Sequence, residues 1–547
     1  MKIVIVGGGT SGLVAAALMN NFWKDKVDIT LYYNPETQSI GVGEGTTPSF
    51  VDVFQETLGY NTEDVIRELD ATIKLGVLFK DWIPDTEYYH GFVEVANDET
   101  DTRSEILTSN VSSFYSLVND CYNGGINFNE ATNTIPANNE LHRHDFAFHI
   151  TTDKLCSFLF KYLEGRVNIV EDIISEVKTD GKNIQSIICE KSGEVSADLF
   201  VDATGLDAML LNKLDGAEWV DLSQYLPLDR AIPQKIKNHS DFIPSYTLAN
   251  ATKHGWIWQI PSQNEYGTGY LYSSKFTTDE EAKNDFNNWL NINHSEKLGE
   301  EPRIIKWNSG YQKRAWIGNC VAVGLSGGFI EPLEALTHQY LTFMVETFMS
   351  LNSTLKMLDY NRDRFNMVQN RILFDYTQFL NLHYCTNRTD SKFWKHMRDN
   401  KTDWVKTMEE KLQHEFLDVF DTDDMLDYWG NDNYIQVMKG INLFNTKAIK
   451  DYMWSRKNPE LLYDDAKQQH DYIEDYKSKT VMVDHKEYLE TKKIVTLTLP
   501  SVKKWIIIET WEAWVSDPRG KCFLNRTSPI SYENSKKIRN GSITNRR

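Results

Sequence analysis

Hydrophobic and polar residues follow two different periods along this chain. Residues 2–6, KIVIV, form an apolar run rich in β-branched residues, which predicts a buried strand. In ATIKLGVLFKDW, residues 71–82, apolar residues occupy every second position and predict another strand, with Lys74 on its opposite face. Residues 276–294 and 338–415 follow the helical period instead. The chain is therefore predicted to combine strands and long helices in an α/β fold.

The same patterns indicate how the chain is divided. Strand-rich stretches dominate residues 1–80 and 165–330, whereas a charged stretch at 455–490 predicts exposed helices. The apolar stretch 493–515 is expected to return to the body of the protein. We expect three parts in chain order: residues 1–345, with an insertion at 80–150 that contributes to the substrate site; a mostly helical part at 346–515; and a basic, mobile tail at 516–547.

Composition and charge narrow the class of protein. With 547 residues, 41% of them hydrophobic and 25% charged, the chain has the composition of a globular protein large enough for two or three cores. Its net charge of −20 argues against nucleic acid or an anionic membrane as a partner. No apolar run approaches the roughly 20 residues that span a bilayer. The six cysteines form no CxxC pair and the start has no signal-peptide layout, so we expect a cytoplasmic protein without a metal site.

A glycine-rich motif follows the first predicted strand. Six residues, GGGTSG, lead from KIVIV into LVAAALMNNF, which has the apolar density of a helix. Glycines permit a tight turn and a close backbone approach, and the helix N-terminus offers free N–H groups to a pyrophosphate. The motif therefore predicts a dinucleotide site, with cofactor contacts at Gly7, Gly8, Gly9, Ser11 and Gly12.

The next strand departs from the usual pattern of such a site. It normally ends in an acid that binds the ribose hydroxyls of the adenosine half. In DITLYYN, Tyr33 occupies that place, which leaves Asn34 or Glu36 to serve instead. We expect Asn34 at the cofactor.

Two downstream segments favour FAD over a nicotinamide cofactor. Residues 197–211 are an apolar strand that ends in Ala-Thr-Gly, and residues 318–338 predict a strand, a glycine-rich turn and a helix. A dinucleotide fold that returns twice to its cofactor fits FAD better, although ordinary strand-to-loop junctions have the same pattern.

Four further strings carry a resemblance to a known family. They are GWIWQIP at 255–261, IGVGEGTTPS at 40–49, QKRAW at 312–316 and IEPLEAL at 330–336. Together with GGGTSG, and in this order, they resemble the flavin-dependent halogenases of the tryptophan halogenase family. The resemblance runs from residue 2 to about residue 345, with weaker similarity to about residue 440. Within the family it points to phage-encoded marine members.

The resemblance implies a fold and a reaction. The fold would be a Rossmann-like FAD-binding box of the flavin monooxygenase (p-hydroxybenzoate hydroxylase) type, with a mostly helical, pyramid-like substrate module. The reaction would use reduced FAD, O₂ and a halide ion to make hypohalous acid, which Lys74 relays to an electron-rich aromatic substrate. A separate flavin reductase would supply the reduced FAD.

The resemblance also implies the residues of the site. Lys74 lies eight residues before Trp82, as the family's catalytic lysine does, and Glu334 matches its active-site glutamate. The glutamate would raise the electrophilicity of the halogen or accept the ring proton. The halide would contact the main chain at Leu336 and Thr337, where Ala-Leu-Thr replaces the family's Ser-Thr-Gly. Further cofactor contacts are expected at Val42, Gly45 and Leu325.

The substrate residues follow from the same comparison. His90 and Phe92 match positions that stack on a planar substrate, and Trp429 and Asn433 match a segment that covers it. The stretch 415–426 lacks the paired tyrosines that hold the amino-acid head group in tryptophan halogenases. A buried ammonium and carboxylate without partners cost several kcal/mol, so a neutral phenol or indole fits better than free tryptophan.

Alternative functions share much of this pattern. An aromatic monooxygenase would keep the fold and transfer oxygen, and a non-catalytic flavin-binding protein would keep only the cofactor. The presence of both Lys74 and Glu334 favours the halogenase over these two alternatives. The acidic composition is compatible with a monomer or a homodimer.

Overall fold

The computed structural model describes most of the chain and leaves several segments out. The described residues are 1–37, 43–92, 133–137, 141, 145–237, 242–293, 295–299, 303–417, 421 and 431–493. The expected tail at 516–547 and nearly all of the apolar stretch 493–515 therefore lie outside the described residues. No helix in the described part is long and apolar enough to cross a membrane.

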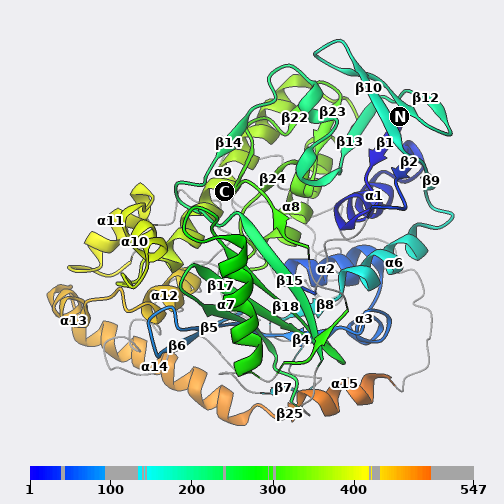
Figure 1. Cartoon of the computed structure of the whole chain (residues 1–547). Helices are drawn as coiled ribbons and strands as arrows, with labels where there is room; N and C mark the ends of the chain where they lie inside the picture. The colour runs from blue at the N-terminus through cyan, green and yellow to red at the C-terminus, as the bar shows by residue number, and fades with distance from the viewer. Residues whose placement is uncertain are drawn as a thin grey trace, which may run out of the picture.

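A six-stranded sheet begins with the first predicted strand. Its strands are parallel except for β22, and α1 (Thr10–Trp23) follows β1 directly, as the glycine motif predicted. Figure 1 shows this sheet with α1 beside it, near the N-terminus. The strand order is β22 (Trp316–Ile317), β23 (Cys320–Ala322), β13 (Leu199–Asp202), β1 (Lys2–Val6), β2 (Asp28–Tyr33) and β9 (Asn168–Glu171). The prediction of a Rossmann-like α/β unit is thereby confirmed.

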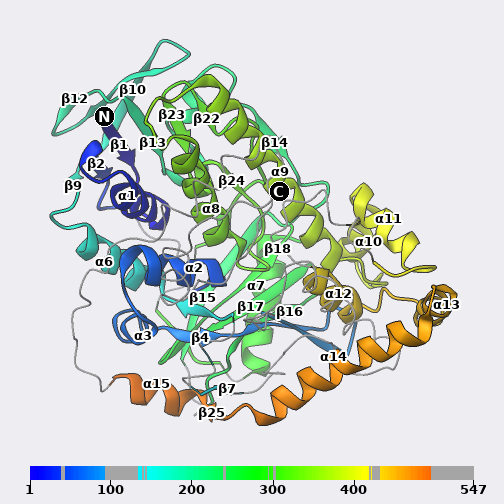
Figure 2. The same ribbon diagram turned by 180° about the vertical axis from the view of Figure 1, so that it is seen from behind.

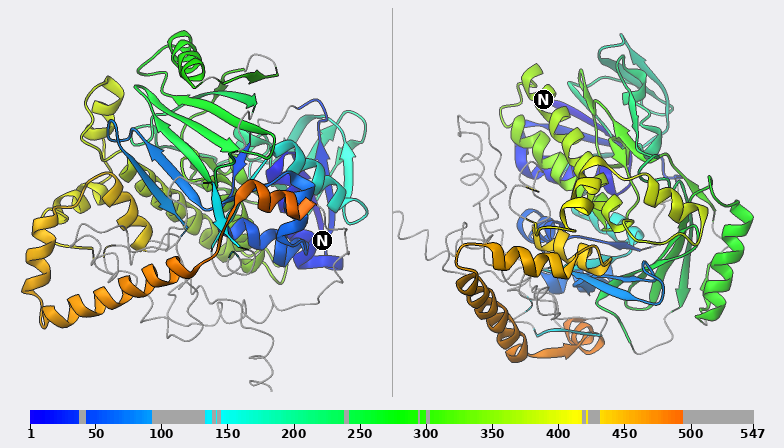
Figure 3. Two further views of the ribbon diagram at one scale, coloured as in Figure 1. Left: turned by 90° about the horizontal axis from the view of Figure 1, so that it is seen from below. Right: turned by 90° about the vertical axis from the view of Figure 1, so that its left-hand side faces the viewer.

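A larger, mainly antiparallel sheet forms the centre of the molecule. Helix α7 (Asp279–Ile292) lies against this sheet, as two views show (Figure 1, Figure 3). Its Phe286 and Leu290 are buried in one cluster with Tyr270 and Tyr272 of the sheet. The strand order is β19 (Lys297–Leu298), β15 (Arg230–Lys237), β18 (Glu265–Tyr272), β17 (Gly255–Pro261), β16 (Tyr246–Ala251), β5 (Gly76–Lys80) and β6 (Glu87–Gly91), with β20 (Ile305–Lys306) also paired to β15.

The strand predicted around Lys74 is divided between two sheets. Strand β4 (Thr72–Lys74) pairs with β8 (Ala147–Ile150), which also pairs with β3 (Glu44–Gly45). The chain then crosses at Leu75, whose N–H donates to Ser245 O at 2.7 Å, and enters β5 of the large sheet. Because both faces of the segment are covered, Lys74 is only 1% exposed. The alternation of the sequence indicated strand correctly but not this change of sheet.

Smaller elements complete the strand-rich part. Two three-stranded sheets contain β10 (Ile174–Thr179), β11 (Ile184–Cys189) and β12 (Gly193–Val195) in one, and β14 (Trp219–Asp221), β21 (Gly310–Gln312) and β24 (Gly328–Phe329) in the other. The helices here are α2 (Pro48–Asp52), which continues as a π-helical turn (Val53–Leu58), α3 (Thr62–Leu69) and α6 (Thr152–Leu163), with short 3₁₀ turns at 24–26, 205–207, 211–213 and 324–326.

Helices dominate the described residues between 336 and 493. Helix α14 runs along the outside of the molecule (Figure 2) and leads to β25 (Met482–Asp484), which pairs with β7 (Thr134–Pro136). Helix α15 then packs on α3, where Lys492 Nζ donates to Glu63 at 2.8 Å. The helices are α8 (Leu336–Leu351), α9 (Asp359–His383), α10 (Lys392–Asp399), α11 (Asp403–Lys411), α12 (Asn431–Gly440), α13 (Thr446–Ser455), α14 (Pro459–Lys479) and α15 (His485–Lys493).

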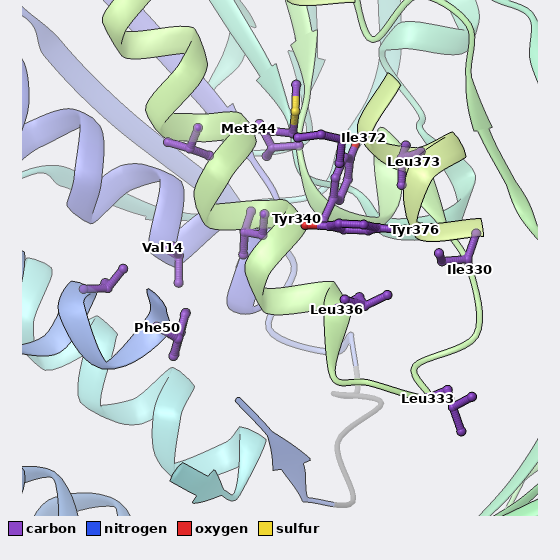
Figure 4. Packing of buried hydrophobic residues seen from close by; sticks show 14 of the residues in the cluster. Val14, Phe50, Ile330, Leu333, Leu336, Tyr340, Met344, Ile372, Leu373 and Tyr376 are labelled. Atoms are coloured by element: carbon purple, nitrogen blue, oxygen red, sulfur yellow. The ribbon is translucent and has the colours of Figure 1, made fainter. Parts of the chain in front are cut away.

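The hydrophobic core fixes the start of α8, where the candidate site lies. Figure 4 shows side chains of α8 packed between α9 on one side and α1 and α2 on the other. The residues that it labels are Val14, Phe50, Ile330, Leu333, Leu336, Tyr340, Met344, Ile372, Leu373 and Tyr376, and each is no more than 5% exposed. Burial of this many apolar side chains holds the first turn of α8 in a defined position.

Candidate active site

The three glycine-rich segments meet beyond the carboxyl ends of β1, β13 and β23. Gly7 has φ +124°, and a Cβ there would lie 2.2 Å from Ala203 O, while a Cβ on Gly324 would lie 2.0 Å from Ser11 Oγ. A Cβ on Gly9 would meet no atom within 4 Å. Helix α1 begins beside this space without an acidic residue or a side-chain cap in its first turn. The residues therefore fit a pyrophosphate, as FAD requires.

Tyr33 closes the second strand in an unexpected way. Its ring lies against Gly8, where a Cβ would be 2.6 Å from Tyr33 Cβ, and its hydroxyl donates to Glu171 Oε1 at 2.8 Å. Burial and this carboxylate raise the pKa of Tyr33 to about 12. Asn34 Oδ1 accepts from the N–H of Glu36 at 2.9 Å and is occupied by a local turn. The end of β9 thus places the Glu171 carboxylate beside Tyr33, at the end of β2 where an acid is usually found.

Lys74 lies against residues 45 and 46, which belong to the segment at and after β3. Its Nζ donates to Thr46 O at 3.1 Å and lies 5.3 Å from the centroid of the Phe92 ring. Thr46 is itself held by β8, because its N–H donates to Phe148 O at 2.8 Å. Gly45 leaves room for the amine, since a Cβ there would lie 3.3 Å from Lys74 Nζ. Burial lowers the pKa of Lys74 to about 8, although the charge of Glu334 opposes this shift.

A neutral histidine separates Lys74 from the large sheet. His149 is fully buried between Thr72 Oγ1 at 3.1 Å and Thr247 Oγ1 at 2.9 Å. Burial first, and then the charge of Lys74, hold the pKa of His149 well below its usual value. Among the described residues, the neighbours of Lys74 on the side of β8 therefore present hydroxyl and carbonyl oxygens and no charged group.

Glu334 lies just before α8 and is 4% exposed. His90 Nδ1 lies 2.8 Å from its Oε1, and His383 Nε2 lies 2.9 Å from the same oxygen. Burial alone would raise the pKa of Glu334, but the charge of His90 and the hydrogen bonds of both histidines lower it to about 2. The same carboxylate holds the pKa of His90 above its usual value despite burial. The ligand atoms of the three residues lie within 4.8 Å of one another, and the two short contacts to Glu334 have hydrogen-bond lengths.

The first turn of α8 provides main-chain donors beside this carboxylate. Ala335 has φ +58°, a left-handed conformation, and the helix begins at Leu336. The N–H groups of Leu336 and Thr337 are the first of a helix of 16 residues, where no intrahelical acceptor exists. A Cβ on Gly45 would lie 3.6 Å from Ala335 Cβ, so Gly45 packs closely against the residue that precedes α8. The positive end of the helix dipole therefore lies beside Gly45 and Glu334.

A second buried glutamate lies three residues earlier. Glu331 is 0% exposed, and Tyr384 Oη donates to its Oε1 at 2.6 Å. Its other oxygen has no hydrogen-bond partner in the part of the chain that the structure describes. Burial raises the pKa of Glu331 to about 8, and the Tyr384 hydrogen bond opposes that shift. Glu331 therefore binds a proton more readily than an ordinary glutamate does.

The structure brings together both predicted catalytic residues and three of the four predicted substrate residues. Lys74, His90, Phe92, Glu334 and Asn433 form one cluster, in which His90 Nε2 lies 2.9 Å from Asn433 Oδ1. The remaining predicted cofactor residue of the described part, Leu325, lies in the turn after β23, and its neighbour Ser326 donates to Gly205 O at 3.0 Å. Val42 and Trp429 lie outside the described residues.

Two residues of the site had no signal in the sequence. His383 is the last residue of the 25-residue helix α9 and lies 49 positions from Glu334, which it contacts only through the fold. Glu171 ends an irregular strand with no motif around it. A systematic search for acids at the ends of all the predicted parallel strands would have found Glu171, whereas nothing local distinguishes His383.

Comparison with known proteins gives a consistent result over most of the chain. A family model described as tryptophan halogenase matches residues 2–452. Tryptophan 7-halogenase RebH of Lentzea aerocolonigenes is 28% identical over 493 residues, which are 81% of this chain and 89% of the relative. The structure of tryptophan 6-halogenase SttH of Streptomyces toxytricini is similar at 26% identity with a TM-score of 0.73, over 89% of this chain and 99% of that chain. The structure of a tryptophan halogenase of Shewanella frigidimarina has a TM-score of 0.74 at 25% identity, over 90% and 97% of the two chains.

Proposed function

This chain belongs to the tryptophan halogenase family of flavin-dependent enzymes, and from that premise we propose that it transfers an electrophilic halogen through Lys74 to an electron-rich arene. Bound and reduced FAD would supply hypohalous acid from O₂ and a halide ion, and a separate flavin reductase would keep the FAD reduced. The chain's own residues would bind the halide, direct the oxidant and remove the ring proton.

The observation that carries this proposal is the buried amine of Lys74. It makes one hydrogen bond within the described residues, to Thr46 O, and it faces the Phe92 ring. With a pKa of about 8, the amine and the ammonium forms are both populated near neutral pH. An ammonium group donates a hydrogen bond to the oxygen of hypohalous acid, and a neutral amine accepts the halogen as a haloamine. In a site of low dielectric constant either interaction is much stronger than in water.

Glu334 would complete the substitution. The arene carbon forms its bond to the halogen as the halogen–oxygen bond breaks, and the departing hydroxide takes a proton from Lys74 to become water. The ring then loses its proton to the Glu334 carboxylate and keeps the C–H electron pair. A carboxylate with a pKa of about 2 is ionised at every working pH and so is ready to accept this proton.

The halide would bind at the start of α8. Main-chain N–H groups of Leu336 and Thr337 and the positive helix end favour an anion there, whatever side chains those residues carry. The replacement of Ser-Thr-Gly by Ala335, Leu336 and Thr337 therefore keeps the donors and changes only the shape of the cavity.

For the substrate we propose a small, neutral phenol or indole. His90 and Phe92 would lie along it, and Asn433, together with Trp429 in the segment outside the described residues, would cover it. The sequence 415–426 contains no tyrosine pair for an amino-acid head group, and a buried head group without partners is costly.

The test combines the protein with FAD, a flavin reductase, NADH and oxygen, and offers chloride, bromide and iodide separately with a panel of phenols and indoles. Mass spectrometry detects halogenated arene, and a scavenger of hypohalous acid measures the oxidant separately. We expect halogenated product from the parent and a loss of at least about 100-fold in Lys74→Met, with hypohalous acid still formed. Lys80→Met is the matched control, because Lys80 is exposed at the end of β5.

Three other outcomes would contradict the proposal. Oxygenated product that does not depend on halide would make the protein a monooxygenase. Retained, reducible FAD without any product would make it a non-catalytic flavin-binding protein. Equal product from Lys74→Met and the parent would remove the lysine from the mechanism.

A further inference from the structure

His383 contacts Glu334, and no motif points to it. We propose that His383 is a positioning residue that holds a proton against Glu334, keeps this carboxylate ionised in its buried site, and leaves only its Oε2 to act as the base. The inference deepens the proposed function, on which its catalytic part rests.

The orientation of the His383 ring is determined by its own helix. Its Nδ1 lies 2.9 Å from Phe379 O, one turn earlier in α9. A carbonyl oxygen can only accept, so Nδ1 carries a proton. The ring is also enclosed by aromatic side chains, with centroids 4.9 Å from that of Phe379 and 5.0 Å from that of Phe79. It is therefore held in one rotamer with Nε2 directed at Glu334.

This orientation requires one additional proton in the pair. Nε2 lies 2.9 Å from Glu334 Oε1, and a neutral ring protonated on Nδ1 would present a lone pair to that oxygen. A contact of this length between two lone pairs is repulsive, so a proton lies between the atoms. The His383–Glu334 pair thus contains one proton more than a carboxylate and a neutral imidazole. This count does not depend on how the amide of Asn433 is oriented.

The two carboxyl oxygens of Glu334 have different surroundings. Both histidines contact Oε1, at 2.8 and 2.9 Å. Oε2 of Glu334 accepts no hydrogen bond from the described residues. It also retains some exposure to solvent, whereas the second oxygen of Glu331 is fully buried. Oε1 is consequently the anchored oxygen, and Oε2 is the one available to a ring proton.

Glu331 shows what burial does to a glutamate that has no histidine partner. The Tyr384 hydroxyl donates to it, and burial nevertheless raises its pKa to about 8. A protonated Glu334 could not accept a proton from the substrate. The titratable groups that face Glu334 are Lys74 from β4, Tyr88 and His90 from β6, and His383 from α9. Of these, only the two histidines contact its oxygen directly.

The test compares two replacements of His383 across a pH series. His383→Gln keeps a hydrogen-bond donor without a charge, and His383→Phe keeps the ring packing without a donor. We expect the acid limb of arene halogenation to move to higher pH by about one to two units in both variants, because a carboxyl that loses an adjacent positive charge binds protons more readily. At pH 8.5 the Gln variant should retain its rate within a few-fold, and the Phe variant should lose about tenfold or more. His396→Gln, on α10 and away from the site, is the control and should leave the profile unchanged.

A second readout does not need turnover. Histidine-labelled protein is examined by NMR at pH 7, with the His383 signal assigned by its absence in His383→Gln. We expect both ring nitrogens of His383 to carry a proton in the parent, and Nε2 to lose it in Glu334→Gln.

The two readouts separate this inference from the proposed function. A parent that makes no halogenated arene refutes the function, and the NMR measurement still decides the state of the pair. A neutral His383 in the parent overturns the inference. So does a rate that falls by the same factor at every pH, since that is the signature of lost packing alone.

Discussion

Glu331 and Glu334 stand three residues apart and are both buried, yet the pKa values of their carboxyl groups are shifted in opposite directions. Glu331 has one donor, the Tyr384 hydroxyl, and a pKa of about 8. Glu334 has two histidines on one oxygen and a pKa of about 2. Depth of burial therefore does not decide whether a carboxyl is ionised in this protein. The hydrogen-bond partners decide the direction in which the pKa of each carboxyl group is shifted.

The largest effect is expected from removing the charge of Glu334. Glu334→Gln should lower the free energy of unfolding by about 3 kcal/mol at pH 7, because the carboxyl pKa is about 2 in the folded protein and near 4.5 when unfolded. This contribution is complete above pH 4.5 and is lost as the pH falls from there towards 2. Urea unfolding at pH 7, 5 and 4 measures it. A difference that stays constant below pH 4.5 would show that the carboxylate gains nothing from its histidines.

The same substitution at Glu331 should act in the opposite direction. Its pKa rises from 4.5 to about 8 on folding, so the parent loses stability from pH 4.5 up to about pH 8, whereas Glu331→Gln does not. We expect the free energy of unfolding of the variant to exceed that of the parent by about 2 kcal/mol at pH 7. This value allows for the cost of burying an amide NH₂ group that has no acceptor among the described residues, and the difference should disappear near pH 5. Thermal and urea unfolding at both pH values test this. A variant that is less stable at pH 7 would remove the contrast between the two sites.

The smallest effect is expected at an exposed carboxylate. Glu171 accepts the Tyr33 hydroxyl at the nucleotide end, and we expect it to bind the ribose of FAD. Glu171→Gln should weaken FAD binding by about fivefold, or about 1 kcal/mol, because solvent competes for an exposed hydrogen bond. Quenching of flavin fluorescence measures the dissociation constant. Glu36→Gln is the matched control, and an equal effect in both variants would return the ribose contact to the end of β2.

Short-range patterns predicted the parts of the fold that depend on local geometry. KIVIV followed by GGGTSG predicted β1, its glycine turn and α1, because turn conformation and helix start are encoded within a dozen residues. The helical period likewise predicted α7, which the structure places at Asp279–Ile292. Lys74 and Glu334 were identified by resemblance, and the structure places both in one cluster.

Long-range pairings were beyond the sequence for a physical reason. His383 meets Glu334 only because α9 packs on α8 and on the strands below, and its surroundings FLNLHY differ in no way from a buried helix end. Tyr33 could be recognised as a departure, but its partner on β9 depends on which strands are neighbours. The pKa values of Glu331 and Glu334 depend on residues that lie between 49 and 244 positions away, so no local pattern distinguishes them.

The crossing of the chain at Leu75 has a consequence for how this protein can change over time. Lys74 is anchored by a small sheet with β3 and β8, whereas Asn433 lies on α12, which packs on β6 and α9. Under the proposed function, substitutions in α12 would change the surroundings of the arene and leave the strands that hold Lys74 and Thr46 unchanged. Selection in residues 431–440 would then alter the substrate range before it altered the position of the amine.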